Sequence, residues 1–405
     1  MNDPLSHPPG HDVAVIGGGP VGLATAIALA QDGAAVALVA PRKPYPDNRT
    51  TALLNGSIAF LERIDVWDRC RDKSAALETM RLVDDTGRLI RAPEVTFACG
   101  EIGLEAFGFN IENRDLVAAL EARAGALDKL ARYDADAETV EIDETDVTVR
   151  TGQAGTVSAR LAVGADGRQS ICRDAAGIEV KRRALDQAAL TFNIAHARPH
   201  HNASTEFHTP EGPCVFVPLP GDRSSVVWVG SPAESRRRMA LSDDDLSREA
   251  ERAMHSILGR VTIAPGRHLF PLAIEQPRQF AKNRIMLAGE AAHVLPPIGA
   301  QGLNMGLRDA ADIAAIVTDV LSRGDDPGAE PAVMRFNAAR RGDITSRTLA
   351  IHLANRSLLS DFIPMQAMRA AGLHLLNAVG PLRRIAMREG LAPRLKPPSR
   401  ARKAM

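Results

Sequence analysis

The stretch Val13-Ala14-Val15-Ile16-Gly17-Gly18-Gly19-Pro20-Val21-Gly22 decides the fold. Its apolar, β-branched first half predicts a buried parallel strand. Gly17, Gly19 and Gly22 then form G-x-G-x-x-G, and Leu23 to Gln31 predicts a helix. Glycine permits a tight turn and a close approach of the backbone to a pyrophosphate, which the helix N-terminus also favours. With a second apolar strand at Ala35 to Val39, the pattern predicts dinucleotide binding, although an ordinary βαβ turn has the same form.

Length and composition set the broad class of protein. The chain has 405 residues, enough for about two to three domains. Its 49 Lys and Arg balance 49 Asp and Glu, so the overall charge does not suggest nucleic acid as a partner. The four cysteines are Cys70, Cys99, Cys172 and Cys214. Their scattered positions indicate reduced, mostly buried thiols and not a disulfide framework or a metal site.

The N-terminus and the hydropathy pattern bear on location. Met1 to Asp12 is polar and proline-rich, unlike a secretory signal. No run approaches the ~20 apolar residues that span a bilayer. We therefore expect a cytoplasmic protein, either soluble or peripheral on the inner membrane.

The pattern of predicted elements changes along the chain. Asn113 to Leu130 predicts a helix. Two alternating stretches, Val140 to Val149 and Val157 to Val163, predict a hairpin leading to Gly164-Ala165-Asp166-Gly167. Short runs in the middle third predict an antiparallel sheet, before α/β and then helical patterns return. The order predicts an α/β (α+β) fold: a discontinuous Rossmann-like nucleotide domain, an inserted, mainly antiparallel β-sheet domain for the substrate and a C-terminal helical segment.

These patterns suggest domain segments. We expect the nucleotide-binding domain to comprise residues 1–78, 100–183 and 280–342. The sheet domain is expected at 79–99 and 184–279, and C-terminal helices with a basic tail at 343–405.

The most informative later stretch runs from Arg284 to Asn304. It contains a strand, a carboxylate at Glu290 just past the strand end, the rigid Pro296-Pro297 pair and Gly302, which opens a long helix. A carboxylate there can accept hydrogen bonds from sugar hydroxyls, and a helix N-terminus can stabilise negative charge on a ring carbonyl. A strand-loop-helix connection without a ligand is the alternative.

This stretch resembles the flavin-binding segment G-D-A-A-H-x-x-P-P-x-G-x-x-G-x-N of the para-hydroxybenzoate hydroxylase superfamily of FAD-dependent aromatic monooxygenases. Asp166-Gly167 resembles the internal D-G motif of that superfamily. Further stretches are similar to its ubiquinone-biosynthesis hydroxylase branch: Asp47 to Leu53, Glu112 to Leu116, Phe207 to Pro213 and Val227-Trp228. The resemblance extends from Val13 to about Leu391 and implies FAD as cofactor.

The resemblance also implies which residues contact FAD. Gly17, Gly19 and Gly22 are expected at the pyrophosphate, and Asp166 and Glu290 at the sugar and ribityl groups. Arg49, Asn113 and Arg114 are expected near the flavin, and Leu303 and Asn304 at its pyrimidine edge, while Gly289 and Gly302 complete the set of cofactor-binding residues. The Pro297 carbonyl, the one catalytic candidate, would lie near the reacting ring edge. A loop salt bridge is the alternative for Arg49, and a solvated charge for Arg114. His293 could serve as an acid or base, but a structural role is favoured.

Two positions depart from the family pattern. The acid that usually ends the second strand and holds the adenosine ribose is missing, because this place reads Val39-Ala40-Pro41-Arg42. The Asp of the later motif is Glu290, which keeps the acceptor but reaches one methylene further. Because the acid after the second strand is missing, the contact with the adenosine ribose must come from elsewhere or be absent.

The resemblance implies a reaction. NAD(P)H would reduce FAD, O2 would form a flavin hydroperoxide, and oxygen would pass to the ring of a polyprenylated phenol in ubiquinone biosynthesis. No second Rossmann fingerprint is visible for the nicotinamide. Two alternatives stay open: a flavin-dependent reductase or dehydrogenase of an isoprenoid or other apolar substrate, and a non-catalytic scaffold subunit with the FAD fold.

The C-terminal part suggests where such a substrate is met. Asp343 to Met387 carries many apolar residues with interspersed arginines, and from Pro381 onward eight Lys and Arg face one acid, Glu389. An apolar face with a basic border predicts peripheral contact with an anionic membrane, or a place in a biosynthetic complex. A helix pair packed on the body, followed by a basic tail, is the alternative.

Overall fold

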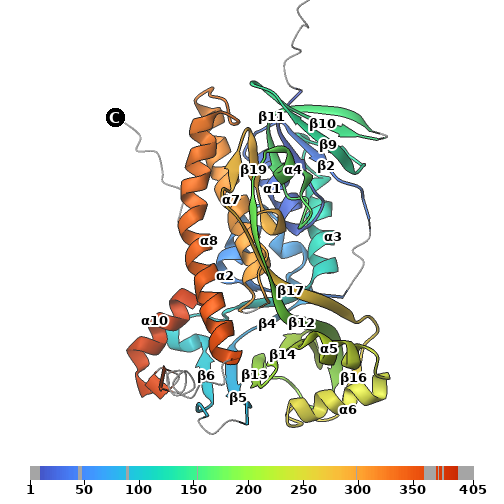
Figure 1. Cartoon of the computed structure of the whole chain (residues 1–405), viewed down its shortest axis with the longest axis vertical. Helices are drawn as coiled ribbons and strands as arrows, with labels where there is room; N and C mark the ends of the chain where they lie inside the picture. Colours follow the sequence, from blue (N-terminus) through green and yellow to red (C-terminus); the bar gives the residue numbers. More distant parts are fainter. Residues whose placement is uncertain are drawn as a thin grey trace, which may run out of the picture.

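The computed structural model describes residues 10–43, 48–87, 91–152, 154–297, 299–359, 371–372, 374–375 and 378–390. Two large sheets lie at opposite ends of the molecule, a small central sheet lies between them, and the long helix α8 runs along one side (Figure 1). The α/β class, the antiparallel sheet and the C-terminal helices predicted from the sequence are confirmed.

The first sheet is built around the N-terminal strand. β1 (His11–Ile16) pairs in parallel with β2 (Val36–Val39) and β11 (Gly155–Gly164). The order is β18 (Ala281–Lys282), β19 (Ile285–Leu287), β11, β1, β2 and β8 (Leu130–Tyr133), with β9 (Ala137–Ile142) and β10 (Val147–Thr151) extending from β11. Every residue of β2 is buried, as expected for a strand covered on both faces.

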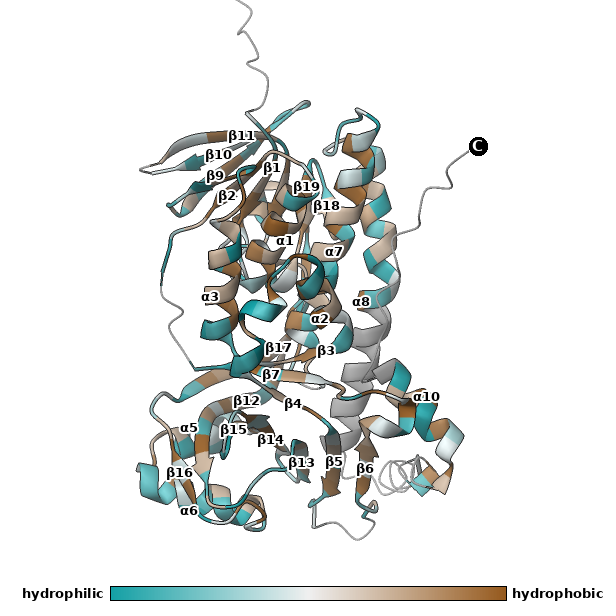
Figure 2. Ribbon diagram, turned by 180° about the vertical axis from the view of Figure 1, so that it is seen from behind, coloured by the Kyte–Doolittle hydropathy of each residue, from teal (hydrophilic) through white to brown (hydrophobic). Residues whose placement is uncertain are grey.

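Helices cover the first sheet. α1 (Pro20–Gln31) packs against α3 (Asn113–Ala124) and α7 (Gln301–Ser322), and α4 (Ile171–Ala175) follows β11. Figure 2 shows apolar residues concentrated on β1 and α1. This core fixes the turn between β1 and α1, where the glycines lie.

Two predicted boundaries are wrong. The helix expected from Asn113 to Leu130 ends at Ala124, because Gly125 is its C-cap and Leu130 pairs with Val36 in the sheet. The stretch from Val140 to Val149 is not one strand of a hairpin: it holds the end of β9 and the start of β10. The polar turn between them is closed by a 2.9 Å bond from the Asp143 N–H to the Asp146 carbonyl.

The second sheet lies at the other end of the molecule. Its order is β16 (Val261–Ile263), β12 (Val180–His196), β15 (Arg223–Gly230), β14 (Gly212–Leu219), β13 (Ala203–Thr209), β5 (Thr79–Asp84) and β6 (Val95–Ala98), with β17 (His268–Pro277) also paired to β12. Helix α6 (Asp243–Ala253) contributes Leu246 to the core between it and this sheet. The strands are mainly antiparallel, and β12, with 17 residues, pairs with three of them.

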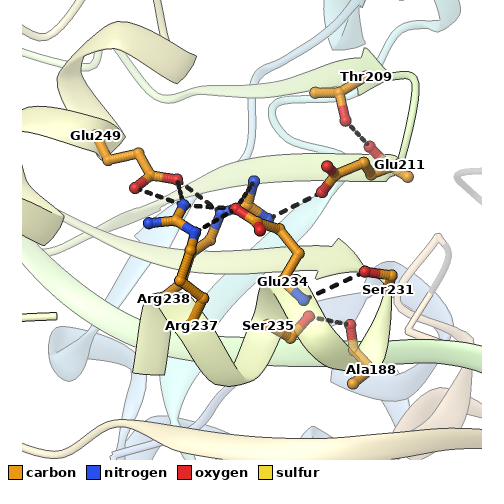
Figure 3. A network of polar contacts seen from close by, with 10 residues as sticks. Ala188, Thr209, Glu211, Ser231, Glu234, Ser235, Arg237, Arg238 and Glu249 are labelled. Atoms are coloured by element: carbon orange, nitrogen blue, oxygen red, sulfur yellow. Dashed lines mark hydrogen bonds and ion pairs between the residues drawn. The ribbon is translucent and has the colours of Figure 1, made fainter. Parts of the chain in front are cut away.

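A charged network holds α5 (Pro232–Met239) on the second sheet (Figure 3). The buried Arg238 guanidinium lies 4.2 Å from the ring centroid of Trp228 and donates to Glu249 of α6 at 2.8 Å. Arg237 binds the same carboxylate. Burial raises the pKa of Glu249, but hydrogen bonds and charges from the two arginines outweigh it and lower the pKa overall. The network is internally satisfied and fixes α5 to α6.

The small central sheet joins the two ends. It has the order β3 (Thr50–Leu54), β7 (Gly108–Glu112) and β4 (Ser74–Ala76), and α2 (Asn55–Arg63) follows β3. Short 3-10 turns complete the described chain, namely η1 (Trp67–Arg69), η2 (Arg71–Lys73), η3 (Cys99–Ile102) and η4 (Gly289–Ala291). All four cysteines are buried and free, as predicted.

In the part of the chain that the structure describes, the helices α8 and α10 follow α7. α8 (Glu330–Leu359) runs without a break across residue 343, where the sequence predicts the C-terminal segment to begin. α10 (Gly380–Gly390) lies beside β6 (Figure 1), with Met387 buried and Arg383 paired to Glu101 at 2.6 Å. Residues 360–370 and the tail from 391 lie outside the described residues, and the division into domain segments stays a prediction. Among the helices that are described, none is long and apolar enough to cross a membrane.

Candidate functional site

The glycine turn, Gly17 to Gly22, is packed too closely for side chains at Gly17, Gly18 and Gly22. A Cβ on Gly17, whose φ is +117°, would lie 2.2 Å from the Ala165 carbonyl oxygen. A Cβ on Gly22 would lie 2.0 Å from the Gly17 oxygen. A Cβ on Gly19 would instead meet nothing within 4 Å, and α1 has no side-chain cap. The turn thus presents the uncapped N–H groups of α1 to open space, which suits a phosphate.

The D-G turn at Asp166 follows β11 and contacts the glycine turn. The Asp166 Oδ2 atom accepts from the Cys172 N–H at 3.1 Å. Its Oδ1 atom is buried and has no hydrogen-bond partner among the described residues. A buried carboxylate oxygen without a donor is unfavourable, so this atom suits a hydroxyl donor of a ligand.

Glu290 follows β19 in the cofactor loop, defined as Gly289 to His293. Its side chain is exposed, and among the described residues it has no hydrogen bond or ion pair. Gly289 packs on the helix that begins at the glycine turn, since a Cβ there would lie 3.2 Å from a methyl group of Val21. The later motif and the glycine turn, far apart in sequence, therefore lie side by side.

The start of α7 supplies further N–H groups. Its N-cap, Ala300, has no side-chain hydrogen bond, so Gln301, Gly302 and Leu303 offer N–H groups without intrahelical acceptors. Gly302 is exposed, and a Cβ there would meet nothing within 4 Å. A polarised ring carbonyl could be held at this helix end.

Asn304 has a different local role. In a helix that begins at Gln301, the Asn304 N–H is the first that reaches an intrahelical carbonyl, that of Ala300. Its side chain, 1% exposed, accepts from the Leu54 N–H at 2.9 Å and the Ser57 hydroxyl at 2.7 Å and donates to the Ala52 carbonyl at 2.8 Å. The structure thus shows Asn304 as a clamp between α7 and β3, while direct contact with the flavin stays a prediction.

The other predicted contacts cluster where β3 meets β7. The Asn113 N–H donates to the Arg49 carbonyl at 2.8 Å, and the Asn113 side chain accepts from the Thr51 hydroxyl at 2.6 Å. The Arg49 guanidinium lies 4.9 Å from the ring centroid of Phe270 on β17, a cation–π contact. Arg49 and Asn113 are thus brought together, and Arg49 reaches the second sheet.

Arg114 is neither free nor fully solvated. It pairs at 2.6 Å with Glu112, a buried carboxylate that also accepts from Arg223 of β15 at 2.7 Å. Sequence analysis missed this role of Glu112. The bridge joins the central sheet to the second sheet, and Thr50 supports it with a 2.8 Å bond to Ser225.

Arg173 was also missed. It is buried and donates to the Arg168 carbonyl at 3.0 Å and to the Ala291 carbonyl at 3.2 Å. It therefore ties the D-G turn to the cofactor loop. No signal in the sequence points to it, because its two acceptors are backbone atoms.

The end of β2 is held by the neighbouring strand. Arg132 donates to the Ala40 carbonyl at 3.0 Å and to Glu121, and Asp134 accepts from the Arg42 N–H at 2.6 Å. The acid that the family has at the end of β2 is absent here. Arg132 of β8 and Asp134, which follows it, instead form hydrogen bonds with the backbone after β2.

The two remaining positions differ in exposure. Pro297 is exposed at the end of the Pro-Pro pair, and residue 298 lies outside the described residues; a role for its carbonyl stays a prediction. His293 is buried, with Nε2 2.7 Å from Asp309 Oδ2, which agrees with a structural role. Within the described residues, no group of side chains is suited to a metal.

These features fit FAD. The glycine turn, the D-G turn, the cofactor loop and the start of α7 present uncapped N–H groups, an unpaired buried carboxylate oxygen and a free carboxylate. N–H groups suit phosphates, and carboxylates suit sugar hydroxyls.

Comparisons with known proteins agree. The FAD binding domain family matches residues 10–329. Ubiquinone hydroxylase UbiL of Rhodospirillum rubrum is 32% identical over 389 residues, which cover 94% of this chain and 89% of that protein. The 3-demethoxyubiquinol 3-hydroxylase of Escherichia coli is 29% identical over 404 residues, 94% of this chain and 98% of the relative.

Solved structures share the fold. p-Nitrophenol 4-monooxygenase PnpA from Pseudomonas putida superposes with a TM-score of 0.78 at 21% identity, over 95% of this chain and 99% of that one. HpxO of Klebsiella pneumoniae, solved with FAD and uric acid, gives a TM-score of 0.73 at 17% identity, over 94% and 97% of the two chains.

Proposed function

We propose, from the premise that this chain belongs to the FAD binding domain family and is an FAD-dependent monooxygenase, that it hydroxylates the aromatic ring of a polyprenylated phenol in ubiquinone biosynthesis. NAD(P)H would be the reductant and O2 the source of oxygen. The observation that carries the proposal is the meeting of the glycine turn and the cofactor loop at Val21. The ubiquinone hydroxylases among the relatives support the substrate class.

The cofactor accounts for the redox chemistry, since bound FAD supplies electron transfer and the activation of oxygen. The chain's own residues bind and orient it. We assign Gly17, Gly19 and Gly22 to the phosphates, and Asp166, Gly289 and Glu290 to the sugar and ribityl hydroxyls. Gly302 and Leu303 would polarise the ring carbonyl, because the α7 N-terminus carries a partial positive charge.

The second sheet would form the substrate side. We propose that residues 79–99 and 184–279 cover the ring face of the cofactor and keep water away from the reacting centre. The Glu112 bridge and the Arg49–Phe270 contact support this proposal, because they fix that sheet against the segments that bind the cofactor.

The proposal predicts a coupled oxygenation. Purified protein loaded with FAD and given a prenylated phenol should oxidise more than one equivalent of NAD(P)H per FAD only in the presence of O2, and labelled O2 should place one oxygen atom in the product. NAD(P)H consumption and mass spectrometry of the product measure both effects.

Each alternative gives a different result. Equal turnover without O2, with no label in the product, would indicate a reductase or dehydrogenase of an apolar substrate. Protein that stays colourless and takes up no FAD would indicate a scaffold subunit. Either result overturns the proposed hydroxylation.

We also propose that α10 places the enzyme on an anionic membrane, where a polyprenylated substrate would be met. Two of the six large apolar side chains that are exposed among the described residues lie on α10, Leu382 (36%) and Ile385 (59%), and two more, Leu375 (51%) and Val379 (38%), lie just before it. Leu382 and Ile385 are three residues apart and therefore lie on one face of α10, which the exposed Arg384 and Arg388 border. The opposite face is docked through Met387.

Acidic substitutions on this face should release the protein from lipid. The double variant L382D/I385D should bind phosphatidylglycerol-containing vesicles with roughly a hundredfold lower affinity than the wild type in sedimentation assays, because two apolar side chains worth about 1.5 kcal/mol each no longer insert. M239D, at an exposed apolar residue of α5, is the control and should sediment normally. Unchanged sedimentation of the double variant would argue against membrane contact through α10.

A further inference from the structure

Asp309 on α7 is completely buried and contacts the cofactor loop. Its Oδ2 atom lies 2.7 Å from His293 Nε2 and accepts from the Gly289 N–H at 3.0 Å. These two residues are the first and last of the loop that carries Glu290. One carboxylate therefore holds the cofactor loop at both ends.

Arg340 on α8 holds Asp309 from the other side. Its Nε atom donates to Asp309 Oδ1 at 2.7 Å, and its Nη1 atom lies 3.0 Å from both Asp312 and Asp343. α8 begins at Glu330, directly after the segment that matches the FAD binding domain family. A helix beyond that segment thus reaches the cofactor loop through one buried ion pair.

Asp309 and Arg340 are both charged in the folded protein. Burial raises the pKa of Asp309, but His293, Arg340 and the Gly289 N–H outweigh burial and lower it overall. Burial lowers the pKa of Arg340, but the three carboxylates outweigh this effect and raise it. Both groups are therefore ionised at neutral pH, and removing Arg340 would leave the buried Asp309 carboxylate without the cation that binds its Oδ1 atom.

Packing transmits any movement of the loop to the glycine turn. A Cβ on Gly306 of α7 would lie 2.5 Å from a methyl group of Val21 and 3.2 Å from the Gly289 Cα atom. α1, the cofactor loop and α7 thus meet without spare space. A small displacement of the loop would shift both Glu290 and the start of α1, because such tight packing is not compressible.

We propose that Asp309 and Arg340 are positioning residues for FAD, which hold the cofactor loop so that Glu290 faces the cofactor and Gly289 stays against Val21. Neither residue needs to touch FAD. The inference rests on FAD binding and not on the proposed substrate, so a failed hydroxylation assay would leave it intact.

Asp309→Asn tests the charge of the clamp. The amide keeps the size of the side chain but weakens its bonds to Arg340 and to the loop, so we expect the dissociation constant for FAD to rise roughly tenfold. Fluorescence titration of the apo-protein measures this constant, and visible circular dichroism of bound flavin should show an altered environment. Asp319→Asn is the matched control: Asp319 lies on the same helix and pairs with Arg323 and with Arg335 of α8 instead of with the cofactor loop, so this variant should keep wild-type FAD affinity.

Asp309→Glu keeps the negative charge but moves the carboxylate by one methylene. It therefore tests the position of the carboxylate and leaves Arg340 with a negatively charged partner. We expect this variant also to bind FAD more weakly and to give an altered flavin signal. Asp309→Glu also provides the test if Asp309→Asn does not fold. A lower melting temperature of the apo-protein, with wild-type FAD affinity and flavin dichroism in either variant, would overturn the inference, because that pattern indicates a role in stability alone.

Discussion

Substituting Gly22 by alanine should give a protein that no longer retains FAD during purification. The new Cβ would lie 2.0 Å from the Gly17 carbonyl oxygen and 3.2 Å from the Ala165 Cβ atom. The first contact is with backbone of the glycine turn, so no side-chain rotation can relieve it. The turn must open, and the uncapped N–H groups at the start of α1 would move away from the pyrophosphate.

The expected loss is large because charge-assisted hydrogen bonds are involved. Losing one to two bonds to a phosphate costs about 3 kcal/mol, which corresponds to roughly a hundredfold weaker FAD affinity. The flavin absorbance of the purified protein and titration of the apo-protein with FAD measure the effect.

Gly125→Ala is a matched control for this prediction. Gly125 caps α3 with a φ of −67°, and a Cβ there would lie 3.5 Å from the nearest atom, an ordinary contact. This variant should bind FAD as the wild type does. If Gly22→Ala also retained FAD with wild-type affinity, the glycine turn would not be the pyrophosphate site.

Asn304→Ala should lower the free energy of unfolding by about 4 kcal/mol and also weaken FAD binding. The substitution would leave the Leu54 N–H, the Ser57 hydroxyl and the Ala52 carbonyl without their present partner in a buried place. Each such group costs about 1–3 kcal/mol. Since these bonds tie the first turn of α7 to β3, the N–H groups of Gly302 and Leu303 would lose their fixed position. Urea unfolding of the apo-protein and FAD titration measure the two effects separately.

Asn337→Ala separates stability from cofactor binding. Asn337 on α8 makes a similar set of buried bonds, accepting from the Phe280 and Ala281 N–H groups at 2.8 and 3.0 Å and donating to the Ala281 carbonyl at 2.7 Å. These bonds hold β18 and no segment assigned to FAD. It should lose comparable stability but keep wild-type FAD affinity. Equal affinity in both variants would show that Asn304 serves the fold alone.

Some of the site could be predicted because its signals are local. The glycine spacing in Gly17 to Gly22 encodes the turn directly, since only glycine fits where a Cβ would strike the Ala165 carbonyl. Glu290 could be singled out because a carboxylate just past a buried strand has no local partner, and the structure leaves it exposed and unpaired among the described residues. These are properties of short segments.

Other residues could not be predicted because their partners are distant. Arg173 binds the carbonyl of Ala291, 118 residues away, and Glu112 pairs with Arg223, 111 residues away. Nothing in the sequence around Arg173 or Glu112 indicates these partners. The end of α3 was misplaced for the same reason: Leu130 continues an apolar helical pattern, but its pairing with Val36 in the first sheet decides its conformation.

The sequence by itself determined the class of fold and the dinucleotide turn, because strand-turn-helix patterns and glycine spacing act over a few residues, and the resemblance of its later motifs to a known superfamily implied FAD. Only the tertiary structure decided which groups hold these motifs together: the Asn304 clamp, the Glu112 bridge and the pair of Asp309 with Arg340. The reason is physical. A buried polar group must find its partner wherever the packing of sheets and helices places one, and that placement depends on the whole chain.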